Sequence, residues 1–141
     1  RPLARIAGAS WTVDRYQLDG DRLADTALFD AALHDVLARA GASGIDAVDV
    51  VELEAQSAWA DVSLTKALGV KGKVSVSPSG GAWAQNPYFC TGLVNAAEAA
   101  MQVSGRAGPH QVKGAKRALA HGSSGFAQQT HGFVLMEGVP A

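Results

Sequence analysis

Short β-favouring runs alternate with helical patterns along this chain, and that alternation restricts its fold more than any other feature. The β-favouring runs cover residues 5–13, 45–53, 74–76, 115–121 and 130–137. The helical patterns cover residues 28–40, 55–68 and 91–103. This order predicts an α/β domain: a three-layer α/β/α unit around a mixed, mostly parallel, five-stranded sheet.

The pattern over residues 28–40 indicates an amphipathic helix. Apolar residues recur there at i, i+3, i+4 and i+7, and polar residues such as His34 lie between them on a solvated side. Gly41 follows this pattern and Gly69 follows the next one, as glycines commonly do where helices end.

The helical pattern over residues 91–103 has almost no polar side. Only Asn95, Glu98 and Gln102 interrupt a run of small and apolar residues, and Thr91 is the predicted N-cap. A helix of this kind is buried on most sides, which one small domain does not provide. We therefore expect another chain or domain to cover it. The chain also begins without Met, so we expect a fragment or half of a longer protein that is not monomeric.

Composition excludes several classes of protein. The 141 residues are 48% hydrophobic and 18% charged, which excludes a disordered tail and fits one domain over residues 1–141. With 12 Lys plus Arg against 13 Asp plus Glu, no basic excess favours nucleic acid or an anionic membrane. The single Cys90 excludes an internal disulfide and a Cys-built zinc site. No apolar run approaches the roughly 20 residues of a membrane span, and a cytoplasmic location is expected.

Candidate site residues lie in the loops that follow the strands, where ligands bind in open α/β sheets. These loops are residues 52–55, 77–92 and 121–125. The middle loop, SPSGGAWAQNPYFCTG, is the most informative. Gly80 and Gly81 allow a close approach of backbone to ligand, and the helix start at Thr91 can point N–H groups at an anion or oxyanion.

These motifs resemble those of the thiolase superfamily. Ser77-Pro78-Ser79-Gly80-Gly81, then Asn86-Pro87, then Cys90-Thr91-Gly92, is similar to the family's N-P-S-G-G, G-H-P and G-A-T-G. Residues 1–6 resemble the opening of the second thiolase half, and residues 45–53 resemble the strand before its H-D-A-F or N-E-A-F motif. Residues 114–125 resemble the lipid-transfer-protein branch. The resemblance implies one C-terminal half of a thiolase, whose central helix is buried between two halves.

The departures from the family pattern carry functional information. Asn86 replaces the family's catalytic His, and Asn cannot act as a general base. Glu54 falls at the His or Asn that helps to hold a thioester carbonyl, and a carboxylate is a poor oxyanion donor unless it is protonated. The family's late catalytic Cys has no counterpart in residues 121–125, and Cys90 is expected to be a small buried side chain. Ordinary thiolytic chemistry is therefore not expected.

Some members of the lipid-transfer branch have lost these residues, and the resemblance to them implies an aldolase of steroid side-chain degradation. They cleave a β-hydroxyacyl-CoA to a ketone and a shorter acyl-CoA, rely on tyrosine, and work with a small OB-fold and zinc-ribbon partner. Tyr88 follows Asn86-Pro87 directly and is the tyrosine that we single out. A tyrosine, with a reference pKa of about 10, needs a lowered pKa or a relay partner such as His to act as base.

The predicted site contains two sets of residues. The catalytic candidates are Tyr88, Asn86, Glu54 and His121. The candidates for substrate binding are Gly80, Gly81, Trp83, Ser123 and Gly125. Backbone N–H groups of these glycine-containing loops are candidates for stabilising the enolate. A role for His131 is less favoured, and His110 is expected to be exposed in a polar loop.

We expect no metal and no cofactor, with CoA as part of the substrate. The expected partners are an acyl-CoA, the N-terminal thiolase half, a second copy in a homodimer, and the small partner named above. Two alternatives stay open. One is a non-catalytic thiolase-like scaffold that binds acyl-CoA. The other is a conventional acyltransferase whose Cys lies in an absent N-terminal half.

Overall fold

The computed structural model describes residues 2–14, 24–85, 89–125 and 128–139. Its strands are β1 (Ala4–Val13), β2 (Val50–Glu52), β3 (Ser75–Val76), β4 (Arg117–Ser124) and β5 (Thr130–Gly138). Its helices are α1 (Ala27–Arg39), α2 (Ala58–Leu68), α3 (Gly81–Gln85) and α4 (Thr91–Ser104), with 3-10 turns η2 (Ile45–Ala47) and η3 (Gly108–His110).

The five strands form one sheet in the order β1-β5-β4-β2-β3. β2 is parallel to both of its neighbours, whereas β5 is antiparallel to β1 and to β4. Four strands therefore run in one direction and β5 runs in the other. The prediction of a mixed, mostly parallel, five-stranded sheet is confirmed.

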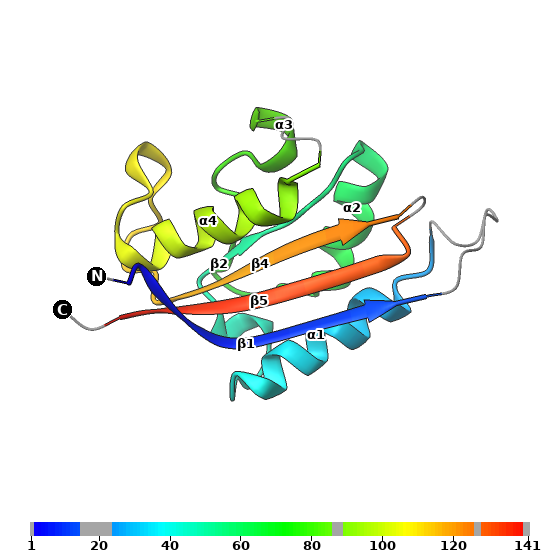
Figure 1. The fold of residues 1–141 in the computed structure, drawn as a ribbon, viewed down its shortest axis with the longest axis horizontal. Coiled ribbons are helices and arrows are strands. Elements are labelled where there is room, and N and C mark those ends of the chain that lie inside the picture. Colours follow the sequence, from blue (N-terminus) through cyan, green and yellow to red (C-terminus); the bar gives the residue numbers. More distant parts are fainter. Residues whose placement is uncertain (1, 15–23, 86–88, 126–127, 140–141) are drawn as a thin grey trace.

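Helices cover both faces of this sheet, which confirms the three-layer arrangement (Figure 1). On one face, α1 and α2 enclose a core that includes Phe29, Val36, Leu64 and Leu119. On the other face, α4 packs a smaller cluster against β2, β4 and β5. The members of that second cluster are Val50, Ala99, Val103, Ala118, Ala120 and Met136.

Helix ends follow local chemistry more closely than hydrophobic periodicity. α2 begins at Ala58 because the Ser57 side chain caps it and accepts a hydrogen bond from the Ala60 N–H at 3.1 Å. Gly69 ends the same helix in the left-handed region, with φ of 62°. The expected cap at Thr91 is wrong: Cys90 is the N-cap of α4, it makes no side-chain cap bond, and Thr91 is the first helical residue.

The expected strand over residues 45–53 is too long. Its first part is the turn η2, and only Val50–Glu52 joins the sheet. Within this turn, the Asp46 carboxylate accepts the N–H groups of Lys71 and Gly72 at 3.2 and 3.1 Å, which ties the turn to the loop after α2. The residues expected to connect the last two strands, Gly122 to Ser124, instead extend β4.

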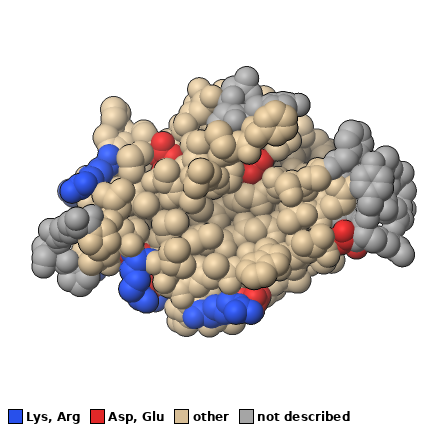
Figure 2. Space-filling view, in the orientation of Figure 1, with Lys and Arg blue, Asp and Glu red and all other residues tan. Residues whose placement is uncertain are grey.

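Helix α4 is oriented with its polar residues inward. Asn95, Glu98 and Gln102 are buried, whereas Leu93 is 74% exposed. Trp11 is also 74% exposed and lies on the α4 side of the sheet. Its register partner is Gly132 of β5, whose partner in β4 is Gly122, and Gly122 lies against α4. Figure 2 shows this side of the molecule with its Lys and Arg toward the margin. The molecule thus presents an apolar surface that its own described residues do not cover.

Within the described part of the chain, no helix combines the length and the apolar character needed to cross a membrane.

Candidate functional site

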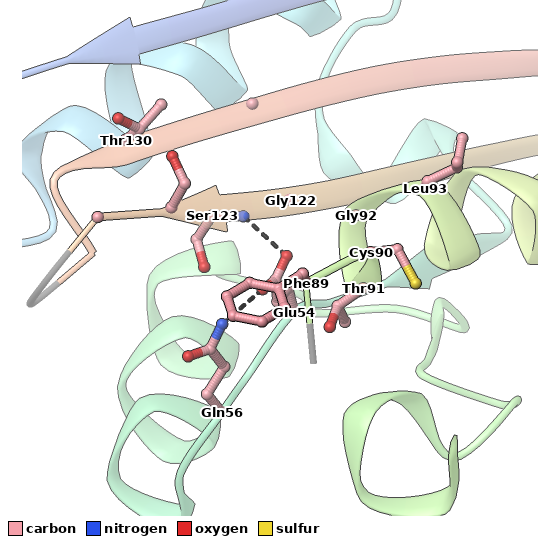
Figure 3. Close-up of a pocket in the computed structure, with 13 residues that line it drawn as sticks. Glu54, Gln56, Phe89, Cys90, Thr91, Gly92, Leu93, Gly122, Ser123 and Thr130 are labelled. Carbon is pink, nitrogen blue, oxygen red and sulfur yellow. Dashed lines mark hydrogen bonds between the residues drawn. The ribbon is translucent and has the colours of Figure 1, made fainter. Parts of the chain in front are cut away.

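A pocket of about 590 Å³ lies where β2 and β4 end and α4 begins (Figure 3). This is the carboxyl edge of these parallel strands, as the sequence predicts. Glu54 and Gln56 line it from the segment after β2. The remaining lining residues are Phe89 to Leu93 at the start of α4, Gly122 to Gly125 at the end of β4, and Thr130 and Gly132 of β5.

Glu54 is the one acidic side chain among the described residues that line the pocket, and it is only 3% exposed. Its Oε2 accepts the Ser123 N–H at 2.9 Å, and its Oε1 accepts Nε2 of Gln56 at 2.7 Å (Figure 3). No Lys, Arg or His is among the described residues that line this pocket. Among the described residues, two neutral donors therefore hold the Glu54 carboxylate.

Two glycines let α4 approach β4 closely beside this carboxylate. A Cβ on Gly92 would lie 3.1 Å from Cα of Gly122 and 3.6 Å from Oε2 of Glu54. A Cβ on Gly122 would lie 3.1 Å from Cα of Gly92 and 3.7 Å from the same Glu54 oxygen. The absence of both side chains brings the helix start within reach of the site and leaves the Glu54 carboxylate open to the pocket.

His121 is fully buried and lies behind the pocket, on the α1 side of the sheet. Its Nδ1 accepts the Glu54 backbone N–H at 3.3 Å, and its Nε2 lies 3.1 Å from Nδ1 of His131. Burial, and then the neighbouring His131, hold the pKa of His121 well below its usual 6.5. His121 does not line the pocket, and its hydrogen bond to Glu54 is made with the main chain of that residue.

The predicted glycine loop supports a second polar cluster rather than the pocket. Gly80 and Gly81 both have positive φ, and they lead into α3, on which Trp83 is 65% exposed. The Ser79 hydroxyl accepts the Gly81 N–H at 3.1 Å and donates to the buried Glu52 at 2.6 Å. None of these residues lines the pocket.

Glu52, at the end of β2, and Glu98, on the buried side of α4, belong to this second cluster. Burial raises the pKa of Glu52 above its ordinary 4.5, the hydrogen bonds from Ser79 oppose the rise, and Glu98 adds to it. Glu98 binds Nε2 of His110 at 2.9 Å and accepts Nε2 of Gln85 at 3.4 Å. His110 is thus engaged with a carboxylate instead of standing free in a polar loop.

The structure brings together only part of the predicted site. Glu54, Ser123 and Gly125 meet at the pocket. Asn86 and Tyr88 lie outside the described residues. Cys90 is exposed and lines the pocket, so the expectation of a buried thiol is wrong.

The sequence analysis did not predict the buried Glu52 or the inward polar residues of α4, although each had a signal in the sequence. Glu52 and Glu54 are two apart at the end of a strand, a spacing that puts two side chains on one face. Asn95, Glu98 and Gln102 recur at helical spacing, which marks a polar stripe. The sequence did not indicate that this stripe is buried. Among the described residues, no group of three or more His, Cys, Asp or Glu could hold a metal ion.

Comparison with known proteins gives a family and a fold. The thiolase C-terminal domain-like family matches residues 25–137. The fold is similar to a crystal structure of a monomeric SCP2-thiolase like protein type 1 from Mycobacterium smegmatis, with a TM-score of 0.66 and 17% identity. That match covers 98% of this chain and 29% of the other, so the chain spans less than a third of that protein. A search of curated proteins found no match.

Proposed function

The chain belongs to the thiolase C-terminal domain-like family, and from this premise we propose that it forms part of the active site of a C–C bond-cleaving enzyme. The proposed substrate is a β-hydroxyacyl-CoA with a bulky apolar portion, such as a steroid side chain. The proposed reaction is a retro-aldol cleavage to a ketone and a shorter acyl-CoA.

The observation that carries this proposal is the position of Glu54. The family motif has His or Asn there, a group that donates to a thioester oxygen. Glu54 instead offers a buried carboxylate at the pocket, held by Ser123 and Gln56 with no cation among the described lining residues. Such a group is better suited to accept a proton than to donate a hydrogen bond.

A retro-aldol reaction needs a proton acceptor at this kind of position. The base removes the proton of the β-hydroxyl, and the O–H electron pair becomes the second bond of the new ketone. The bond between Cα and Cβ then breaks, and its electron pair forms the thioester enolate. Protonation at Cα completes the shorter acyl-CoA, so the reaction balances without an oxidant, a reductant or a cofactor.

The start of α4 is the proposed source of stabilisation for the enolate oxygen. Thr91, Gly92 and Leu93 line the pocket, and the Val94 N–H is bonded back to the Cys90 carbonyl at 2.9 Å. The N–H groups of the first helical turn have no partner inside their own helix, and they carry its positive end. The side chain of the N-cap residue, Cys90, makes no capping hydrogen bond at this end of α4.

Tyr88 remains a second candidate for the base or for a proton donor to the enolate. It immediately precedes Phe89 and Cys90, both of which line the pocket. Asn86 is proposed as a polar group of the same segment.

The N-terminal half of a thiolase is the proposed occupant of the apolar surface on α4. Leu93 and Trp11 lie on that surface, whereas the polar residues of the helix are already buried. The share of the Mycobacterium smegmatis protein that this chain spans supports the same proposal. Homodimerisation of the complete protein and a small OB-fold and zinc-ribbon partner are proposed from the family resemblance alone.

The test is the rate of ketone release by the complete protein carrying Glu54→Gln. Gln keeps the size and an acceptor for Ser123 but cannot take the proton, so we expect kcat to fall about 100-fold or more. Glu137→Gln is the matched control, because Glu137 lies far along β5 in ion pairs with Arg5 and Arg117. Ketone release at the full rate by the Glu54 variant would overturn the proposed base. Acyl-CoA binding without any turnover by the unmodified protein would favour a scaffold.

A further inference from the structure

The main chain at Glu54 is held by a side chain rather than by the sheet. The ladder between β2 and β4 ends with the pair of Glu52 and Ala120. Two residues later, the Glu54 N–H donates to Nδ1 of His121, the residue that follows Ala120. β4 therefore holds Glu54 at two points, its backbone N–H through the ring of His121 and its carboxylate through the Ser123 N–H.

The hydrogen bonds of His121 fix which of its nitrogens carries the proton. Since Nδ1 accepts from Glu54, the proton of the neutral ring is assigned to Nε2, which then donates to Nδ1 of His131 at 3.1 Å. The second ring therefore carries its own proton on Nε2. Phe29 packs edge-on against both imidazoles, with centroid distances of 5.2 and 5.5 Å.

We propose that His121 and His131 form a positioning pair, two neutral stacked imidazoles that fix the main chain of Glu54 and so aim its carboxylate into the pocket. The role of Glu54 in this inference rests on the proposed function. His121 is not a catalytic residue in this account, because it does not line the pocket and contacts the site through Glu54.

A protonated imidazole could not hold the Glu54 main chain in this way. Protonation of His121 would set an N–H of the ring against the N–H of Glu54, and protonation of His131 at Nδ1 would set it against Nε2–H of His121. Among the described residues, the titratable side chain that contacts the His121 ring is His131 on β5, whereas Glu54 meets the ring through its backbone N–H. The contacts from the helices are Phe29 on α1 and Asn95 on α4, which donates to the His121 carbonyl at 2.9 Å, and neither residue titrates.

The kinetic test compares three variants in the complete protein. His121→Leu removes the acceptor, and His121→Asn restores a carbonyl oxygen as acceptor with an NH₂ donor beside it. Phe29→Leu disturbs the same core without touching a hydrogen bond. We expect His121→Leu to lower kcat for ketone release about 10- to 100-fold with KM within about threefold, since a misplacement near 1 Å can cost about 100-fold. We expect His121→Asn to recover most of the lost kcat, and Phe29→Leu to stay within about threefold of the unmodified protein.

A second measurement needs no enzymatic activity. Hydrogen exchange of the Glu54 amide is expected to be slow in the unmodified protein, in H121N and in F29L, and faster in H121L. Imidazole ¹⁵N spectra are expected to show His121 with a bare Nδ1 and a protonated Nε2. If the protein releases no ketone, the proposed function fails while these two readouts still decide the pair. Equal exchange in H121L and H121N, or the opposite tautomer of His121, would overturn the positioning pair.

Discussion

The close contact between α4 and β4 leads to a prediction about two paired glycines. Gly122 and Gly132 are register partners in β4 and β5. A Cβ on Gly122 would lie 3.1 Å from Cα of Gly92, whereas a Cβ on Gly132 would have its nearest neighbours, carbonyl oxygens of Gly122 and Ser10, at 3.8 and 3.9 Å. Gly122→Ala and Gly132→Ala therefore add the same methyl group at a crowded and at an open position.

The expected difference follows from these distances. Carbon atoms pack best at about 3.5–4.0 Å, so G122A must move α4 and β4 apart by roughly half an ångström. The clash is with backbone, which no side-chain rotation relieves, and overpacking of this kind costs about 1–3 kcal/mol. Replacing a strand glycine by Ala returns about 0.5–1 kcal/mol. We expect G122A to lose roughly 0.5–2 kcal/mol and G132A to gain up to about 1 kcal/mol.

Urea unfolding of the two variants and the parent, followed by circular dichroism, measures this difference. In thermal unfolding the same free energies correspond to about 3–5 °C per kcal/mol for a chain of this size. G122A should also lower ketone release, because Ser123, which holds the Glu54 carboxylate, is the next residue. Equal stability of G122A and G132A would refute the close packing of α4 on β4.

Three further changes test the polar cluster, the core and the apolar surface. Because the folded pKa of Glu52 is raised, the folded state binds a proton where the unfolded state is ionised, so the free energy of unfolding should fall as pH rises from 4.5 through that raised pKa. Glu52→Gln should flatten this dependence in urea midpoints taken between about pH 4.5 and 7.5, and an unchanged slope would contradict it. Phe29→Ala should destabilise the fold by about 3–5 kcal/mol in chemical unfolding, because Phe29 is fully buried against both imidazoles and Phe133, and a loss below about 1 kcal/mol would count against that core. Leu93→Asp should leave folding stability within about 0.5 kcal/mol but weaken association with the proposed N-terminal half in sedimentation experiments. Val62→Asp, at a similarly exposed position on α2, is its control, and equal binding by the two variants would place the partner elsewhere.

Hydrophobic patterning was sufficient to predict the layers of this fold. The 3.6-residue period over residues 28–40 corresponds to α1, and the β-favouring runs near both ends correspond to β1, β4 and β5. The strand prediction failed over residues 45–53, where Asp46 accepts two N–H groups from about 25 residues away. Local propensity carries no information about such a contact.

The site could be predicted only in part for the same reason. Glu54 was recognised from its place in a motif, but its partner Ser123 is 69 residues distant, and their contact depends on the pairing of β2 with β4. The inward polar stripe of α4 is visible in the spacing of its residues. The groups that this stripe meets, Glu52 and His110, lie on other elements, so the spacing alone does not show that it faces inward.

We propose that the Glu54 pocket serves a C–C cleavage rather than a thiolysis. The most direct measurement is mass spectrometry of the products that the complete protein forms from a branched or steroidal β-hydroxyacyl-CoA, with and without added free CoA. The proposed reaction predicts a ketone and a shortened acyl-CoA in equal amounts, formed without free CoA. Products that require free CoA, with acetoacetyl-CoA thiolysis in the parallel assay, would contradict it.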